Sequence, residues 1–357
     1  MSIKEIAEKA GASPATVSRV LNNPDYKCAQ AGMREKIWKI AMEMNYTPNE
    51  AARNLKKGAS RQQNNYYIDV LMTRMDGGHA DPFFEELLRC VESQIHENSC
   101  IVSGVWYQSL FSDDAKCEKA NLDKILEEMF SEEEKHQGGL IIIGKCNSLV
   151  IQKLKSYYKN IVSVNRNSTN YVVDEVLCDG RKIATMAVEY LAGLGHEKIA
   201  YVGKCHGEAR YQGYMDVLHR LALDFYPEYV VETRQTEKEG YKVMQKFLQL
   251  DVPPTGIYCA NDITAIGMLK CINQYKNLMY VPSIIASDNI EESQMIKPML
   301  STVSLPKENM AKFALYLLLD RIQGGHSGVV RMELEGKLMI RSSCFPVDKG
   351  SGEKYYI

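Results

Sequence analysis

Polar side chains that can bind a small molecule stand just beyond several short apolar runs of this 357-residue chain. Asn165, Arg210, Asn261 and Asp288 are the clearest examples. Arginine can donate two parallel hydrogen bonds to paired oxygen atoms, and Asp and Asn can accept hydrogen bonds from hydroxyl groups. Taken singly, each is more typical of a helix cap or a turn than of a ligand contact. The pattern alone leaves both interpretations open.

The elements that would position these residues alternate regularly between 66 and 321. Short apolar runs predict strands, and amphipathic segments between them predict helices. Strands that are apolar on both faces and alternate with helices indicate parallel sheets covered by helices. Some 280 residues of this pattern exceed one normal domain, so we expect an α/β body of two lobes. Ligands of open α/β sheets bind beyond the carboxyl ends of the strands, so the polar residues above would meet in a cleft between the lobes. The predicted strands are 66–72, 100–106, 139–143, 161–164, 199–202, 256–259 and 283–286, and the predicted helices include 83–97, 182–194, 208–221, 239–250, 263–275 and 309–321.

Motifs for catalysis, metals and cofactors are missing from the sequence. Gly139–Cys146 nearly spells a phosphate-binding loop, but cysteine replaces the required Ser or Thr, and Leu140–Ile143 reads as a buried strand. The ten cysteines are scattered singly, without a CxxC pair. An enzyme would also need a nucleophile–base pair, and none is visible. We therefore expect no enzyme activity, no metal and no cofactor.

The first 46 residues predict three short helices. Ser2 and Glu5 form a capping box, Gly11 ends the first helix, and Ser13-Pro14 begins the second. Two short helices joined by a tight glycine turn are a helix-turn-helix, although a plain three-helix cap remains an alternative. The second helix runs from Pro14 to about Asn22, and a third covers about 33–44. Glu50–Lys57 can form a further short helix, but it is too short to be stable without a partner.

Charge divides the chain in the same place. Residues 1–60 contain ten Lys or Arg and six Asp or Glu, whereas the whole chain has a net charge of −2. The sequence also lacks a signal region at its start and any apolar stretch long enough to span a membrane. A small basic head on a larger acidic body, placed in the cytoplasm, is the expected organisation.

Residues 3–58 resemble the DNA-binding head of the lactose/galactose-repressor (LacI/GalR) family. The match includes the Ala-Gly turn, Thr-Val-Ser-Arg-Val and Tyr-x-Pro-Asn, and the likeness continues to about Cys344. The resemblance implies a homodimeric transcriptional repressor of a sugar-utilisation operon that is released by a small sugar. It also implies a body like periplasmic binding proteins and binding to pseudo-palindromic operator DNA. It implies a head at 1–46, a hinge helix and linker at 47–65, a body at 66–345 and a tail at 346–357. It also implies chain crossings between the lobes near 165, 290–305 and 323–328, so that 66–165 and 305–323 form the first lobe, and 166–304 and 324–345 the second.

The resemblance also assigns roles in DNA binding. Pro14, Ala15 and Arg19 match base-reading positions, and arginine can bind guanine through two hydrogen bonds. Leu55 matches the hinge leucine that wedges between base pairs in the minor groove. The complete set implied is Ser2, Pro14, Ala15, Thr16, Ser18, Arg19, Asn22, Asn49, Ala52 and Leu55.

For the cleft, the resemblance implies a sugar effector. Arg210 matches an effector-binding arginine, and Phe83 and Phe84 fit an aromatic floor against the C–H face of a sugar. The complete set is Phe83, Phe84, Asn165, Arg210, Asn261 and Asp288. Asp81-Pro82-Phe83-Phe84 points to the galactose-repressor branch of Gram-positive bacteria, and so to galactose or a galactoside. The direction of the response stays open, since a corepressor or an activator would use the same parts. A periplasmic solute-binding protein shares such a body, but it needs a signal peptide and no basic head.

Overall fold

The computed structural model describes residues 3–22, 32–44, 66–76, 79–130, 138–275 and 280–347. The chain divides into two compact units, residues 1–64 and 65–357, which are treated separately below. We call the first unit the head and the second the body.

The head consists of helices packed around one small core. They are α1 (Ile3–Ala10), α2 (Pro14–Asn22) and α3 (Met33–Glu43). Gly11 turns the chain after α1 with φ +69°, a conformation that glycine adopts at little cost. Ser13 caps α2, because its Oγ accepts the backbone N–H of Thr16 at 3.1 Å. The three helices enclose an apolar core of Ile6, Ala7, Ala10, Val17, Val20, Leu21, Ile37 and Ala41, which recur at helical spacing along each helix.

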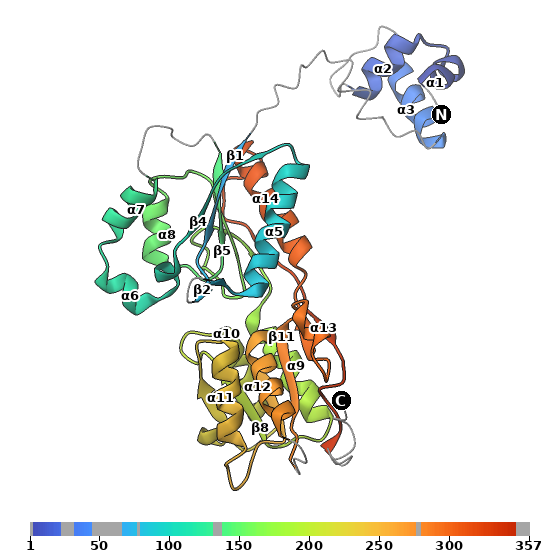
Figure 1. Cartoon of the computed structure of the whole chain (residues 1–357). Coiled ribbons are helices and arrows are strands. Elements are labelled where there is room, and N and C mark those ends of the chain that lie inside the picture. The colour runs from blue at the N-terminus through green and yellow to red at the C-terminus, as the bar shows by residue number, and fades with distance from the viewer. Residues whose placement is uncertain are drawn as a thin grey trace. The chain divides into compact units, whose positions relative to one another are not determined.

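The body has two lobes, each built on a six-stranded sheet (Figure 1). The first sheet has the order β13-β7-β6-β5-β1-β4, and every pairing in it is parallel. Its strands are β1 (Tyr67–Met72), β4 (Ile101–Tyr107), β5 (Gly139–Ile143), β6 (Ile161–Asn165), β7 (Asp174–Leu177) and β13 (Arg331–Glu333). The second sheet has the order β14-β12-β11-β10-β8-β9, with only β14 antiparallel. Its strands are β8 (Ile199–Gly203), β9 (Val230–Glu232), β10 (Gly256–Cys259), β11 (Ser283–Asp288), β12 (Ser301–Ser304) and β14 (Lys337–Met339).

Helices cover both faces of the first sheet. On one face, α5 (Pro82–Glu97) and α14 (Lys307–Ile322) pack on the side chains of Val70 and Ile141. On the other, α7 (Leu122–Phe130) and α8 (Ser148–Leu154) pack on Leu71 and Ile142. Because neighbouring residues of a strand point to opposite faces, continuous apolar runs such as β5 are buried on both sides. The short elements β2 (Met75–Asp76), β3 (His79–Ala80) and α6 (Asp114–Lys119) complete this lobe.

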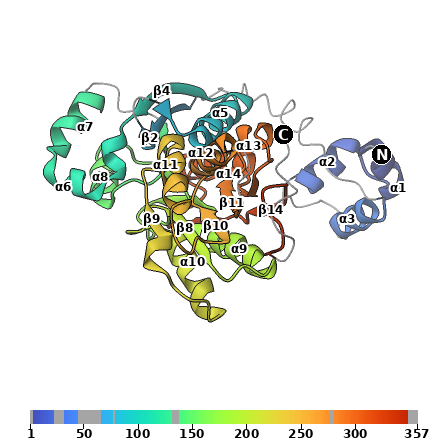
Figure 2. The same cartoon turned by 60° about the horizontal axis from the view of Figure 1, so that its bottom comes forward.

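The second lobe places its helices in two pairs (Figure 2). They are α9 (Gly180–Gly193) with α10 (Ala209–Arg220), and α11 (Glu237–Phe247) with α12 (Asp262–Gln274), followed by the single turn α13 (Glu292–Met295). Gly240 and Gly267 allow α11 and α12 to approach closely. A Cβ at Gly240 would lie 2.0 Å from the backbone oxygen of Thr264, and one at Gly267 would lie 2.0 Å from that of Glu237. This close packing fixes the start of α12, which faces the cleft.

Two of the predicted crossings between the lobes are wrong. The first lies after β7, between 178 and 180, and not near 165; the last lies between β13 and β14, at 334–336, and not at 323–328. The middle crossing, at 305–306 before α14, agrees with the prediction. The errors have one cause: β7 and β13 pair with each other at the edge of the first sheet. Short edge strands carry little periodic signal, so the first lobe keeps segments that the sequence assigned to the second.

The long predicted elements are otherwise confirmed within a few residues. Gly139–Ile143 is a fully buried central strand, as predicted, and not a phosphate-binding loop. The short strands β7, β9, β12, β13 and β14 and helices α6, α7 and α8 were not predicted.

Candidate DNA-recognition helix and effector cleft

Helix α2 presents its polar side to solvent. Pro14, Ala15 and Arg19 are exposed, and Thr16 and Ser18 are half-buried, while Val17, Val20 and Leu21 face the core. The three residues that the resemblance assigned to base reading therefore lie on the exposed side of a helix that its own core holds in place. A helix exposed in this way can enter the major groove.

Several predicted DNA contacts lie outside the described residues. These are Ser2, Asn49, Ala52 and Leu55, and the side chain of Asn22 at the end of α2.

The junction of the two lobes in the body contains a cavity of about 260 Å³. Its lining includes Phe84, Asn165 and Arg210 from the predicted effector set. A second, wider cavity of about 890 Å³ shares Arg74 and Lys204 with it and extends to Gln235. We call the two the inner and outer cavity. Both lie beyond the carboxyl ends of strands from both sheets, as the fold class predicted.

Arg210 lies at the start of α10 and is almost fully buried, with 2% of its surface exposed. Its Nε donates to Oε1 of Glu208 at 2.8 Å, and its Nη1 donates to the backbone oxygen of Ala260. Burial alone would raise the pKa of Glu208, but the charges of Arg210, Arg166 and Arg74 outweigh it and hold the pKa at about 2. Burial alone would lower the pKa of Arg210, but Glu208 raises it instead. The two groups thus form a permanent buried ion pair at the cavity wall.

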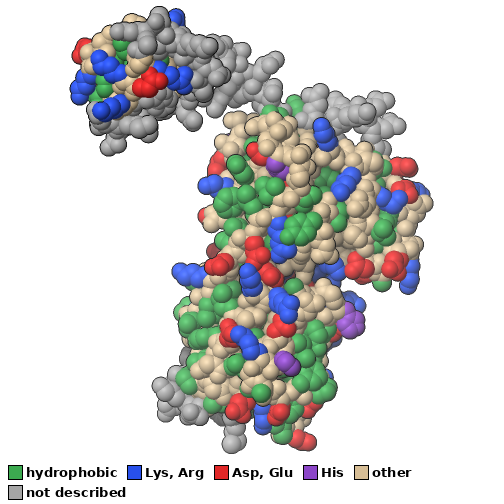
Figure 3. Space-filling model, turned by 180° about the vertical axis from the view of Figure 1, so that it is seen from behind, with side chains coloured by type: hydrophobic (Ala, Val, Ile, Leu, Met, Phe, Trp, Pro, Cys, Tyr) green, Lys and Arg blue, Asp and Glu red, His purple; other side chains and the backbone are tan. Residues whose placement is uncertain are grey.

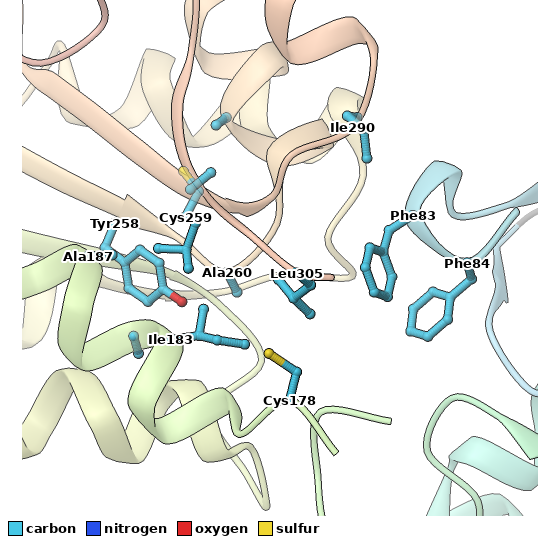
Figure 4. Packing of buried hydrophobic residues seen from close by; sticks show 14 of the residues in the cluster. Phe83, Phe84, Cys178, Ile183, Ala187, Tyr258, Cys259, Ala260, Ile290 and Leu305 are labelled. Atoms are coloured by element: carbon cyan, nitrogen blue, oxygen red, sulfur yellow. The ribbon is translucent and has the colours of Figure 1, made fainter. Parts of the chain in front are cut away.

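Arg166 and Asp288 join the two lobes. Arg166 follows β6 of the first sheet, Asp288 ends β11 of the second, and Nη1 of the arginine donates to Oδ1 of the carboxylate. The guanidinium lies over the rings of Phe83, at 4.7 Å from the ring centre, and Phe84, at 5.0 Å. Both rings stand at the start of α5 and belong to a buried apolar cluster that also contains Leu305, which Figure 4 shows on the side of Phe83. Aromatic faces attract cations, so the rings hold Arg166 in place for Asp288.

Asn261 is held by the protein on every side. Its Oδ1 caps α12 through the hydroxyl and the N–H of Thr264, at 2.5 and 3.3 Å. Its Nδ2 donates to the backbone oxygen of Gln235 at 3.0 Å and, more weakly, to Oδ2 of Asp81 at 3.4 Å. Asp81 in turn caps α5. Asn261 is therefore both the ordinary helix cap that its position suggested and a link between the lobes.

Asp262 is a second buried carboxylate close enough to Asp288 for their charges to interact. Asp262 accepts the hydroxyl of Thr302 at 2.6 Å and the N–H of Ile290 at 3.0 Å. Burial raises the pKa of Asp262 to about 7, and the negative charge of Asp288 adds to the increase. Burial also raises the pKa of Asp288 to about 6, although Arg166 opposes the change.

All six predicted effector residues come together at the lobe junction, but not in equal roles. Phe84, Asn165 and Arg210 line the inner cavity. Phe83, Asn261 and Asp288 are buried beside it and engage other protein groups, as described above. Leu305, which is buried, adds an apolar side chain to the junction.

Most of the other lining residues were not predicted from the sequence, among them Arg74, Lys204, Glu208 and Gln235. Arg74 stands two residues after β1 and Lys204 directly follows β8, so the rule that selected Asn165 could have found both. Gln235 follows β9, which was not predicted, and it adopts φ +67°, so no sequence signal indicated it.

Two family models match this chain. The model described as "Bacterial regulatory proteins, lacI family" matches residues 2–49, and "Periplasmic binding protein-like domain" matches residues 188–344. The chain is also 32% identical to the transcriptional repressor CytR of Escherichia coli K12, in an alignment that covers 96% of each protein. The chain therefore belongs to the LacI family of bacterial transcriptional regulators.

Solved structures share the fold. A complex of the regulator CelR with cellobiose has a TM-score of 0.66 and 20% identity, and covers 96% of this chain and 100% of its own. The lac repressor dimer bound to operator and the anti-inducer ONPF has a TM-score of 0.62 and 22% identity, and covers 97% of this chain and 99% of its own.

The described residues also show what the body does not contain. None of their helices is long and apolar enough to cross a membrane, and no group of three or more of their His, Cys, Asp and Glu side chains could hold a metal ion.

Proposed function

We propose that this regulator is a homodimeric repressor of a sugar-utilisation operon, released from its operator when a small sugar binds in the cleft between the lobes. The observation that carries the proposal is the combination of an exposed recognition helix and a polar cavity in one chain. The relatives support it: CytR is named a repressor, and CelR was solved with cellobiose. We place the protein in the cytoplasm, with its operator DNA, and propose no enzyme activity.

The mechanism couples lobe movement to the hinge. One head offers little surface, so two heads on a two-fold axis would read a pseudo-palindrome. The solved lac repressor is a dimer on its operator, which supports the same arrangement here. An effector that changes the contacts between the lobes would change the spacing of the two hinge segments and so the affinity for DNA. Such coupling is typically about 1–3 kcal/mol.

The direction of the response can be measured directly. An operator selected from random duplexes is titrated with the purified full-length protein, with and without sugars. Weaker binding with sugar supports induction, and tighter binding indicates a corepressor. A chain that prefers no duplex over random competitor would contradict the proposal.

Leu55 gives a separate test of the hinge. Leu55→Ala removes the side chain proposed to wedge between base pairs. This insertion stabilises only a bent operator. Operator binding should weaken much more than binding to random DNA, as measured by fluorescence anisotropy. Equal losses on both duplexes would remove the hinge from the mechanism.

The identity of the sugar is the most specific part of the proposal. Asp81-Pro82-Phe83-Phe84 suggested galactose or a galactoside and the galactose-repressor branch of Gram-positive bacteria, and that suggestion stays a prediction. The charged residues around the cavity bear on the chemical class of the sugar.

A further inference from the structure

The cavity charges divide into paired and unpaired groups. Three cations that line the inner cavity each contact a carboxylate: Arg166 with Asp288, Arg210 with Glu208, and Lys145 with Asp114 at 2.9 Å. Arg74 and Lys204 differ, because no carboxylate of the described residues lies within ion-pair distance of either. Both line the inner and the outer cavity, so they stand where the two meet.

The carboxylates nearest to these two cations are engaged elsewhere. Glu208 binds Arg210, Asp81 caps α5, and Asp113 caps α6 and pairs with Lys116 at 3.5 Å. Glu232, also in the lining, is exposed to solvent. Burial lowers the pKa of Arg74; the charge of Asp81 opposes this change, and the charges of Arg166 and Arg210 add to it. Burial, followed by the charge of Arg74, lowers the pKa of Lys204. The junction therefore holds two partly desolvated cations that repel each other.

Gln235 adds an unsatisfied donor at the same place. Its Oε1 accepts Nη2 of Arg74 at 2.8 Å, and since arginine only donates, this bond fixes the orientation of the amide. Nε2 of Gln235 is then the free end. It is buried in a side chain that is 4% exposed, and it has no hydrogen-bond partner among the described residues. A buried donor without an acceptor is costly, and such a group in a cavity wall suits a ligand oxygen.

We propose that the effector is a sugar that carries an anionic group, a carboxylate or a phosphate, bound by Arg74, Lys204 and Nε2 of Gln235. This inference rests on the proposed function and specifies its ligand. Arginine and lysine beside an amide donor supply several N–H groups and positive charge to a cluster of anionic oxygens, whereas a neutral hydroxyl would leave both charges uncompensated. Arg74 and Lys204 also line the inner cavity, where Phe84 and Asn165 would contact the sugar ring, while Gln235 lines the adjoining outer cavity.

The experiment uses sets of sugars that differ only at C6. Each set contains the neutral sugar, its uronate and its 6-phosphate, in the galactose and the glucose configurations. Thermal stability of the full-length protein and release from the operator are both recorded. A ligand that binds only the folded state raises the melting temperature. We expect a uronate or a 6-phosphate to act at concentrations where the neutral sugar does not, and comparison of the two anions tells which group is recognised.

Substitutions test which residues bind the anionic group. Gln235→Glu keeps the side-chain size but places a carboxylate beside Arg74, so the protein itself would supply the anion. This change and Lys204→Gln should each weaken the anionic ligand by roughly tenfold or more, the size expected for a lost charged hydrogen bond. Lys145→Gln is the matched control, because Lys145 lines the same cavity but already pairs with Asp114. It should leave the affinity within about twofold.

The outcomes separate this inference from the proposed function. A neutral sugar that releases the operator as well as its anionic counterparts overturns the anionic ligand but keeps the sugar-responsive repressor. Equal losses in Lys145→Gln and Lys204→Gln overturn the assigned residues. If no sugar of either kind alters melting or operator binding, both the proposed function and the inference fail.

Discussion

The recognition helix and the cleft are organised in opposite ways. In the head, the candidate DNA contacts Pro14, Ala15 and Arg19 lie on one exposed face of a nine-residue helix. In the body, the cavity collects Arg74, Arg210 and Gln235 from segments far apart in the chain. Arg166 and Arg210 are buried there and engaged in ion pairs. On the surface of the body, acidic and basic side chains lie close together (Figure 3). The candidate DNA contacts of the head thus come from one short helix, whereas the cleft depends on pairings between remote segments.

Arg210→Ala should show the largest effect. The substitution leaves Glu208 buried without its cation, and breaking such a pair typically costs about 3–5 kcal/mol. Urea unfolding of the body should report this loss, and the sugar response should disappear, while operator affinity under conditions where the protein is folded stays unchanged. The double variant Arg210→Ala/Glu208→Gln should recover part of the stability. Unchanged unfolding in the single variant would break the contrast with the head.

Arg19→Ala should act mainly on base recognition. The lost contact to guanine is worth about 1–3 kcal/mol of discrimination at one base pair in each half-site. Binding-site selection should show relaxed preference there, with an unfolding free energy changed by less than about 0.5 kcal/mol. Lys36→Ala, at another exposed cation of the head, is the control and should leave the base preference intact. Loss of stability in Arg19→Ala would contradict the independence of the recognition face.

Asp262 should make the stability of the body depend on pH. Its pKa is raised to about 7 in the folded body, so its protonation favours the folded state. The contribution of Asp262 is therefore complete below its ordinary pKa near 3.8 and is lost as pH rises through about 7. One such group lowers the unfolding free energy by at most about 1.4 kcal/mol per pH unit.

Asp262→Asn should flatten that slope between pH 4 and 7. The amide can still accept the N–H of Ile290 and can donate to the hydroxyl of Thr302, so the local bonds are kept. Urea unfolding across this range measures the slope. A slope identical to that of the unmodified protein would assign the pH dependence to other groups, such as Asp288.

Ser13→Ala should have the smallest effect. It removes the cap of α2, a change worth about 1 kcal/mol of stability. Hydrogen exchange of the α2 amides should accelerate accordingly, and the body should be unaffected. Ser13→Asp is the control, because aspartate also caps helices. An equal change in the body would show that the two units unfold together.

The place of the cleft was predictable from residue positions, but the partner that each of its residues binds was not. The rule that polar residues follow strands brought Asn165, Arg210, Asn261 and Asp288 to the correct junction. It could not show that Asp288 would bind Arg166, or that Asn261 would remain a helix cap. Arg166 and Asp288 lie more than a hundred residues apart, and the cap of α12 competes with a ligand for the side chain of Asn261. Only the folded chain decides which of these contacts forms.

The sequence by itself determined the local features of this protein. The helix-turn-helix follows from Gly11, Ser13 and the apolar stripes, and the two α/β lobes follow from buried strands alternating with helices, because these signals operate over a few turns of chain. The tertiary structure alone decided which edge strands close the first sheet and which carboxylates pair with Arg166 and Arg210. It also decided that Arg74 and Lys204 have no carboxylate of the described residues within ion-pair distance, and that Nε2 of Gln235 has no hydrogen-bond partner among them. Electrostatic pairing in a buried site depends on distances between remote segments, and those distances exist only once the chain has folded.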